Sequence, residues 1–313
     1  MKEKILARLA QAQPGRVSGQ ELGDELNVTR AAVWKAVEAL RAEGFVIESA
    51  AGGGYRLLDA PNRVRRCLVQ NLLTTRALGR AITVLDEAGS TNAVLREKAA
   101  SGGVHGETVL ARRQTAGRGR LGRSFHSPQD GGVYLSVLLT RDFDPAQVTI
   151  RAAAAVHRAV AALCGLTCEI KWVNDLLLDG RKICGILTEG VCELETGAIT
   201  GAICGIGVNV GGGFPPELQD IAGTLPADTD KNALAAAVLN ELEKCLDEDF
   251  ETLLVYYRRH CPLPGQCVTV RPIGAEAYEA RAVAIDEKGR LVVERGGERI
   301  ALPGGEVSLH REH

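Results

Sequence analysis

The chain has 313 residues, of which 45% are hydrophobic and 24% are charged, and its formal net charge is −2. This length predicts two or three domains, and the composition is typical of a soluble globular protein rather than a disordered or fibrous one. The sequence has no run of 18 apolar residues and no continuous apolar stretch behind its basic start, which argues against a membrane span and a secretory signal.

The chain contains nine cysteines, an odd number, and none of them forms a CxxC pair. Most have apolar neighbours, as Cys184 and Cys204 do, which is typical of buried, reduced thiols. The sequence therefore predicts a cytoplasmic protein without a structural metal.

The first 62 residues predict a small helical domain. Apolar residues at helical spacing predict a helix over residues 2–11. Ser18 with Glu21 three residues later has the pattern of a capping box, so a short second helix is expected from there to Asn27. Thr29 is the next N-cap and opens a third helix over residues 30–43, which Gly44 ends.

Two short strands around the glycines at 52–54 predict a β-hairpin after the third helix. This order of elements is that of a winged helix-turn-helix, in which the second helix of the pair enters the major groove of DNA. Residues 1–66 carry 11 Lys/Arg against 8 Asp/Glu, which agrees weakly with DNA binding. The alternative is a helical domain used for protein contacts. The side chains predicted to contact DNA are Thr29, Arg30, Trp34, Lys35 and Arg56.

The polar triplet Ser90-Thr91-Asn92 follows a predicted strand over residues 82–86 and precedes a segment with helical spacing. At such a junction each of the three side chains could simply cap the helix, which is the simpler interpretation. Alternatively, hydroxyl and amide groups at a helix N-terminus could bind a compact polar ligand.

Glycine and arginine alternate in the segment 114–123, which follows a short predicted strand over residues 109–111. This segment cannot form a regular helix or strand by itself, because glycine is costly to order and only Leu121 has a large apolar side chain. Its guanidinium and backbone N–H groups are suited to carboxylate or phosphate. We interpret it as a loop that closes over an anionic ligand. The alternative is a solvated linker or a nucleic-acid-binding tail.

Apolar runs after this loop predict the rest of an α/β domain. Strands are expected over residues 132–139, 169–178, 181–187 and 205–210, with turns at 179–180 and near 195–197. Helices are expected over residues 151–163 and, as one long amphipathic helix, over 232–257. Lys171 falls inside an otherwise apolar strand, where a lysine needs an anionic partner or an edge position.

Short strands separated by turns predict a small β-barrel after Pro262. They are expected over residues 266–270, 278–285, 291–293, 299–302 and 307–309.

Several of these segments together, in their order along the chain, resemble the biotin–protein ligases, and specifically the bifunctional type that is also a biotin-operon repressor. The resemblance covers essentially the whole chain. Its motifs are Ser90-Thr91-Asn92, Gln114 with Gly117-Arg118-Gly119-Arg120, Lys171-Trp172-Val173-Asn174-Asp175, Arg181-Lys182 with Gly185-Ile186-Leu187, and Gly205-Ile206-Gly207-Val208-Asn209.

The resemblance implies a multidomain α/β protein. Its parts would be a winged helix-turn-helix over residues 1–62, a class II synthetase-like ligase domain with a mixed sheet over 63–261, and an SH3-like domain over 262–313. Two departures from the family pattern stand out: valine at 173 where proline is common, and phenylalanine at 125 where tryptophan is common. The expectation is that Val173 keeps its strand and that Phe125 still stacks on a base.

The resemblance also implies roles for matching residues. Lys171 and Arg120 would be catalytic, with Lys171 at the biotin carboxylate or the α-phosphate. Arg123, Phe125 and Asn209 would lie towards the nucleotide, and Asn174 and Asp175 would support the site. The residues implied to bind biotin or its adenylate are Ser90, Thr91, Asn92, Gln114, Gly117, Arg118, Gly119, Arg120 and Lys171.

The activity implied is formation of biotinyl-5′-adenylate from biotin and ATP, with Mg²⁺ on the phosphates, and transfer of biotin to a lysine of a biotin carboxyl carrier protein. The adenylate would also act as corepressor for a homodimer on operator DNA. Two alternatives remain open on the sequence: a lipoate–protein ligase-like acyltransferase and a non-catalytic biotin-responsive repressor. The sequence lacks an Arg-Arg-x-Ser-Gly-Gly-Gly stretch, which speaks against the lipoate enzyme.

Overall fold

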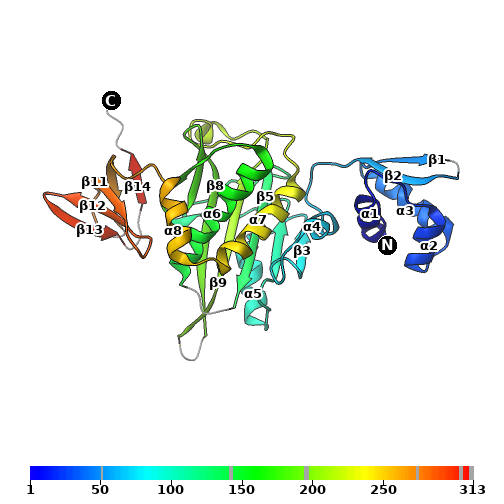
Figure 1. Cartoon of the computed structure of the whole chain (residues 1–313), viewed down its shortest axis with the longest axis horizontal. Helices are drawn as coiled ribbons and strands as arrows, with labels where there is room; N and C mark the ends of the chain where they lie inside the picture. The colour runs from blue at the N-terminus through cyan, green and yellow to red at the C-terminus, as the bar shows by residue number, and fades with distance from the viewer. Residues whose placement is uncertain (51, 141–143, 194–196, 273–274, 303–305, 310–313) are drawn as a thin grey trace.

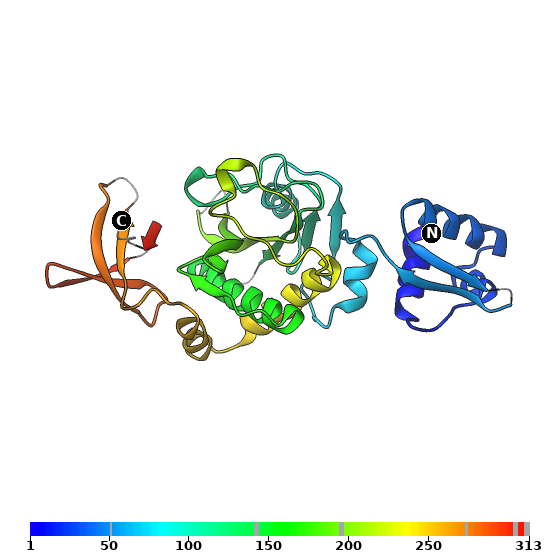
Figure 2. The same ribbon diagram turned by 90° about the horizontal axis from the view of Figure 1, so that it is seen from above.

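The computed structural model describes residues 1–50, 52–140, 144–193, 197–272, 275–302 and 306–309. Figure 1 shows an elongated molecule in which a helical unit and a small sheet lie at opposite ends of a larger layered unit. The view from above in Figure 2 shows the same three parts in a row. Of the helices among these residues, none is both long and apolar enough to cross a membrane.

The N-terminal unit has the predicted order of elements: α1 (Lys2–Gln11), α2 (Gly19–Leu26), α3 (Arg30–Ala42), β1 (Val46–Ala50) and β2 (Gly54–Asp59). The hydroxyls of Ser18 and Thr29 accept from the backbone of Glu21 and Ala32, so both predicted N-caps form. The expected capping box is only half made, because the Glu21 carboxylate binds Arg8 at 2.8 Å. This unit has its own apolar core.

The short helix α4 (Arg66–Leu72) joins this unit to the central one. Cys67 of α4 packs in the N-terminal core, whereas Val69 packs in the central core. Just before α4, Asn62 Nδ2 donates to the carbonyls of Ala227 (3.0 Å) and Thr229 (2.8 Å). The connection is therefore held by hydrogen bonds rather than left as a free linker.

The central unit is built on a mixed seven-stranded sheet in the order β3-β4-β5-β9-β8-β7-β6. Only β3 and β4 pair in parallel, and all other neighbours are antiparallel. The strands are β3 (Ile82–Leu85), β4 (Thr108–Ala111), β5 (Gly132–Leu139), β6 (Glu169–Lys171), β7 (Asp175–Leu178), β8 (Arg181–Cys192) and β9 (Ile199–Asn209).

Helices cover both faces of this sheet, because alternate residues of a strand point to opposite sides. Leu110 of β4 belongs to the large core under α6 (Pro145–Cys164) and α7 (Lys231–Asp247). Its neighbour Val109 packs instead with Leu95 of α5 (Thr91–Ala100). The unit also contains helix α8 (Phe250–Arg259) and two short 3-10 turns, η1 (Arg120–Gly122) and η2 (Pro216–Leu218).

The strand predicted over residues 169–178 is wrong, because β6 and β7 are two strands of a tight hairpin. Lys171 pairs with Asp175, and the chain reverses at Trp172-Val173-Asn174. The buried Trp172 points its indole N–H at the carbonyl of Gly289, 3.0 Å away in the C-terminal unit. Val173 therefore lies in a turn and does not continue a strand, contrary to expectation. A continuous apolar run does not distinguish one strand from two that are both buried.

The long helix predicted over residues 232–257 is also divided. Helix α7 ends at Asp247, and Asp249 caps α8 by accepting from the backbone N–H of Thr252 at 2.9 Å. Helix α6 begins six residues earlier than predicted, after the N-cap Asp144. The turn expected near 195–197 lies largely outside the described residues, although β8 and β9 pair on either side of it.

The C-terminal unit is an antiparallel five-stranded sheet in the order β13-β12-β11-β10-β14. Its strands are β10 (Cys267–Arg271), β11 (Tyr278–Ile285), β12 (Leu291–Arg295), β13 (Glu298–Leu302) and β14 (Glu306–Leu309). Arg258 of α8 donates to the carbonyl of Ile285 at 2.8 Å, which together with the Trp172–Gly289 bond ties this sheet to the central unit.

Candidate functional site

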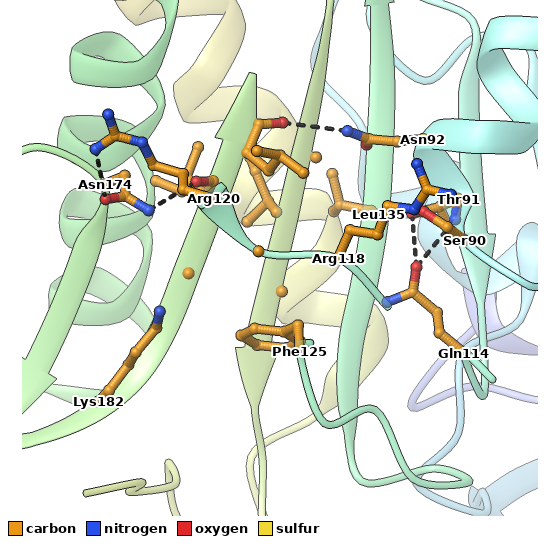
Figure 3. A pocket seen from close by; sticks show the side chains of 17 residues that line it. Ser90, Thr91, Asn92, Gln114, Arg118, Arg120, Phe125, Leu135, Asn174 and Lys182 are labelled. Atoms are coloured by element: carbon orange, nitrogen blue, oxygen red, sulfur yellow. Dashed lines mark hydrogen bonds between the residues drawn. The ribbon is translucent and has the colours of Figure 1, made fainter. Parts of the chain in front are cut away.

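A small cavity of about 50 Å³ lies between the start of α5, the Gly/Arg loop and the strands β8 and β9. Figure 3 shows Arg120, Asn174 and Lys182 on one side of it, and Ser90, Thr91 and Gln114 on the other, with Phe125 between them. The lining residues are Ser90, Thr91, Asn92, Gln114, Arg118, Gly119, Arg120, Phe125, Leu135, Asn174, Lys182, Gly185, Ile186, Leu187, Gly205, Ile206 and Gly207.

Hydrogen bonds organise the polar side of the cavity. Gln114 Oε1 accepts from the backbone N–H of Thr91 (2.9 Å), and Gln114 Nε2 donates to Ser127 Oγ (3.0 Å). The fully buried Ser136 of β5 lies 2.6 Å from Thr91 Oγ1 and donates to Asn92 Oδ1 at 2.6 Å.

Ser90 occupies the N-cap position of α5, but its side chain makes no capping hydrogen bond. The first backbone N–H of the helix, that of Thr91, is instead satisfied by Gln114 from the Gly/Arg loop. The interpretation of Ser90 as a simple cap is wrong, because a distant side chain takes that place. Ser90 is one of the residues that line the cavity.

The Gly/Arg loop folds back on itself beside the cavity. Gly119 N donates to Arg123 O at 2.7 Å, and Phe125 N donates to Gly117 O at 2.9 Å. A Cβ on Gly117 would lie 2.5 Å from Phe125 O, so only glycine fits there. Arg118, Gly119 and Arg120 line the cavity, whereas Gly117 and Arg123 do not.

The lysine on the cavity is Lys182, and Lys171 is not among the lining residues. Lys182 Nζ lies 2.7 Å from Asp175 Oδ1 and 5.9 Å from the centre of the Phe125 ring. The structure therefore does not bring Lys171 to the cavity, because the hairpin puts it at the end of the edge strand β6. The sequence analysis named Lys182 as part of a family motif but assigned it no role in the site.

Glycines on adjacent strands form the floor of the cavity. Gly185 pairs with Gly207 across β8 and β9, and a Cβ on Gly207 would lie 2.5 Å from the Phe125 ring. A Cβ on Gly205 would lie 2.3 Å from Asn92 Oδ1. Gly205 and Gly207 lie two residues apart on β9, and Gly185 of β8 pairs with Gly207. The sequence analysis quoted these glycines as family motifs but did not use their spacing to predict the floor.

Asn174 and Asn209 support the cavity in different ways. Arg120 Nη1 donates to Asn174 Oδ1 at 3.4 Å, and Asn174 Nδ2 donates to Ile186 O at 2.9 Å, so Asn174 lies on the cavity wall. Asn209 is buried behind it, and its Nδ2 donates to Gly223 O at 3.0 Å and to Lys182 O at 3.4 Å. Asn209 therefore holds the backbone that carries Lys182 and does not line the cavity.

Two buried thiols and one buried phenol of the central sheet have raised pKa values. Burial raises the pKa of the Cys184 thiol and raises that of Cys204 to about 12. Burial likewise raises the pKa of the Tyr134 phenol, whose ring meets Phe125 edge-on. Neither thiol is therefore suited to act as a nucleophile, and the cavity is instead suited to positioning a ligand and neutralising its charge.

The predicted DNA contacts lie on two elements of the N-terminal unit. Arg30, Trp34 and Lys35 are exposed on α3, and Trp34 keeps 54% of its surface accessible. Thr29 precedes them as the N-cap. Arg56 lies on β2 and forms an ion pair with Glu48 at 3.0 Å.

Three family models match the chain in sequence: an HTH domain over residues 2–56, the biotin/lipoate A/B protein ligase family over 87–209, and the biotin protein ligase C-terminal domain over 265–310. The bifunctional ligase/repressor BirA of Bacillus spizizenii is 31% identical over 94% of this chain and 94% of its own length. BirA of Escherichia coli is 30% identical, over 98% of this chain and 96% of its own. A solved biotin protein ligase from Aquifex aeolicus, in complex with biotin and ATP, covers 74% of this chain and all of its own, with a TM-score of 0.64 and 28% identity.

Proposed function

Because the chain belongs to the family of bifunctional biotin ligase/repressor proteins, we propose that its central cavity makes biotinyl-5′-adenylate from biotin and ATP. The same site then transfers biotin to a lysine of a biotin carboxyl carrier protein. The observation that carries this proposal is the arrangement of the cavity, in which hydrogen-bonding groups around Thr91 and Gln114, with Arg118 beside them, lie opposite the cations Arg120 and Lys182.

This division suits a ligand with a compact polar ring at one end and a carboxylate at the other. A ureido ring offers two N–H donors and one carbonyl, which match the side chains of Ser90, Asn92 and Gln114. The carboxylate and the α-phosphate then meet Arg120 and Lys182. A lipoyl ring has no hydrogen-bond donors or acceptors of this strength and would leave the polar side unpaired, so the geometry favours biotin.

The chemistry consists of two nucleophilic substitutions. A carboxylate oxygen of biotin attacks the α-phosphorus of ATP, the bond to the β-phosphate oxygen breaks, and pyrophosphate leaves. The acceptor lysine amine then attacks the carbonyl carbon of the mixed anhydride, AMP leaves, and the new amide loses a proton. Both steps depend on positioning and charge neutralisation more than on a protein nucleophile. We assign Lys182 the place at the carboxylate and α-phosphate that the sequence suggested for Lys171.

We propose that Mg²⁺ enters with ATP and is held chiefly by phosphate oxygens and water. Among the described residues there is no group of three or more His, Cys, Asp or Glu that could hold a metal. Asp175, next to Lys182, is a carboxylate that could bind water of the metal's hydration shell. The metal would neutralise charge on the pyrophosphate as it leaves.

The experiment that tests this proposal is ATP–pyrophosphate exchange by the purified protein with biotin, with lipoate and with no acid. We expect exchange with biotin only. Exchange with lipoate alone would establish the acyltransferase alternative. No exchange with either acid, combined with tight biotin binding, would leave a non-catalytic biotin-responsive repressor.

We also propose that the N-terminal unit binds operator DNA as part of a homodimer that the adenylate stabilises. In each protomer, α3 and the wing, which is the β1–β2 hairpin, would then contact one DNA half-site. The half-sites would be spaced by whole helical turns of DNA, roughly 34 Å each. Among the described residues, a strand edge of β8 without a strand partner supports dimerisation, because β7 pairs with β8 only up to Gly185, whereas β8 continues to Cys192. A second copy could extend the sheet there.

We expect Lys35→Ala to weaken binding of the full chain to duplex DNA, because Lys35 is an exposed cation on α3. The slope of log affinity against log salt should fall by about one, as for the loss of one phosphate contact. Fluorescence anisotropy with a labelled duplex at several salt concentrations measures both. Lys4→Ala, which removes an equally exposed lysine from α1, is the matched control and should leave the slope unchanged. Equal effects of the two substitutions would argue against α3 as the reading helix.

The finer features of the architecture remain proposals of the same kind. The matched ranges 2–56, 87–209 and 265–310 fall within the proposed domains 1–62, 63–261 and 262–313 and support those boundaries. We propose an SH3-like barrel for the C-terminal sheet and a class II synthetase-like origin for the central one. Nine cysteines, all free, support a cytoplasmic location, where thiols stay reduced.

A further inference from the structure

Glu189 lies outside the cavity but directly behind one of its walls. It follows Leu187 by two residues on β8, so both side chains point to the face of the sheet that α5 covers. Glu189 Oε2 accepts from Asn92 Nδ2 at 2.7 Å, and Glu189 Oε1 accepts from Arg96 at 2.5 Å. Asn92 itself is buried and lines the cavity.

The amide of Asn92 is held by contacts on both of its ends. Its Nδ2 donates to Glu189 and, at 3.3 Å, to the carbonyl of Leu187. These two acceptors use both hydrogens of the amide nitrogen. Its Oδ1 accepts from Ser136 and faces the glycine floor of the cavity. A Cβ built on Gly205 would lie 2.3 Å from Oδ1 but 3.1 Å from Nδ2, so the oxygen is the nearer atom.

A carboxylate and a carbonyl accept hydrogen bonds and cannot donate them. With Glu189 and Leu187 O on one side, a flipped amide would place Oδ1 against two acceptors and lose about three hydrogen bonds. The only orientation that satisfies every atom turns Oδ1 towards Ser136 and the cavity. That oxygen has a second lone pair, which Ser136 does not use.

We propose that Glu189 is a positioning residue of the ligase site, which locks the Asn92 amide so that Oδ1 is presented as an acceptor to an N–H of the ureido ring of biotin. The inference rests on the proposed function, since it takes biotin as the ligand. Glu189 acts only through Asn92 and does not touch the ligand.

The test swaps the amide of Asn92 and the carboxylate of Glu189 between the two positions. Isothermal titration calorimetry measures the Kd of biotin for each variant of the full chain. Asn92→Asp places a carboxylate against Glu189 and should raise the Kd by about a hundredfold or more. Adding Glu189→Gln supplies an amide that donates to the new carboxylate, and the double variant should recover to within about tenfold of the unaltered protein. Glu189→Ala alone should raise the Kd by about tenfold and should have no further effect in an Asn92→Ala background.

Arg96→Ala is the matched control, because it removes the other partner of Glu189 without touching Asn92. It should change the Kd by less than about threefold. A Glu189→Ala variant that binds biotin as the unaltered protein does would overturn the inference. So would a double variant as weak as Asn92→Asp when both melt at the same temperature. Failure of the unaltered protein to bind biotin would instead reject the proposed function, so the two failures are distinguishable.

Discussion

Replacement of Lys182 by alanine is expected to slow the formation of biotinyl-5′-adenylate by a hundredfold or more. Lys182 is the lysine on the cavity, and its Nζ lies 2.7 Å from Asp175 Oδ1 and 5.9 Å from the centre of the Phe125 ring. A well-aimed cation or donor in such a site contributes about 3–4 kcal/mol to lowering the barrier. The measurement is the initial rate of ATP–pyrophosphate exchange at saturating biotin. The melting temperature should change little, because removing Lys182 leaves the backbone contacts of β8 in place.

Lys171→Ala is the matched control for this prediction. Lys171 lies at the end of the edge strand β6, opposite Asp175, and does not line the cavity. We expect its exchange rate to remain within about threefold of the unaltered protein, as for a partly exposed charge. The reverse result, with Lys171→Ala impaired and Lys182→Ala active, would restore the assignment that the sequence suggested and reject the one from the structure.

The second large effect is expected for Gly205→Ala, which should raise the Kd of biotin by a hundredfold or more. The added Cβ would lie 2.3 Å from Asn92 Oδ1, closer than real contacts allow. Asn92 cannot move aside without losing its bonds to Glu189, Leu187 and Ser136, each net worth about 1 kcal/mol. Isothermal titration calorimetry with biotin measures the loss.

Gly190→Ala provides the comparison for Gly205→Ala. Gly190 lies on β8, and a Cβ there would meet only Ile199 atoms at 3.9–4.0 Å, which is ordinary contact. Its Kd for biotin should therefore match that of the unaltered protein. If both glycine variants bound biotin normally, the floor of this cavity would not be the place where the ligand lies.

Local signals were sufficient for most elements of the chain. Ser18, Thr29 and Gly44 end or begin helices through bonds within a few residues of themselves, and the structure has those helices where they were predicted. Short strand segments separated by turns likewise predicted the strands of the C-terminal sheet to within about two residues. The errors fall where a long apolar segment reverses or breaks, as at Trp172–Asn174 and at Glu248–Asp249. At both places distant residues contribute, since Trp172 donates to the carbonyl of Gly289 and Arg151 donates to the carbonyl of Glu248 at 2.7 Å.

The sequence by itself determined the family, the order of the parts and the identity of the polar and Gly/Arg motifs, because these depend on residue type and spacing. Only the tertiary structure decided which lysine reaches the cavity, which residue caps α5 and which way Asn92 faces. Each of those outcomes depends on a contact between strands or loops far apart in sequence: Lys182 with Phe125, Thr91 with Gln114, and Asn92 with Glu189. Spacing along one segment contains no information on such contacts, since they form only when the sheet brings its strands into register.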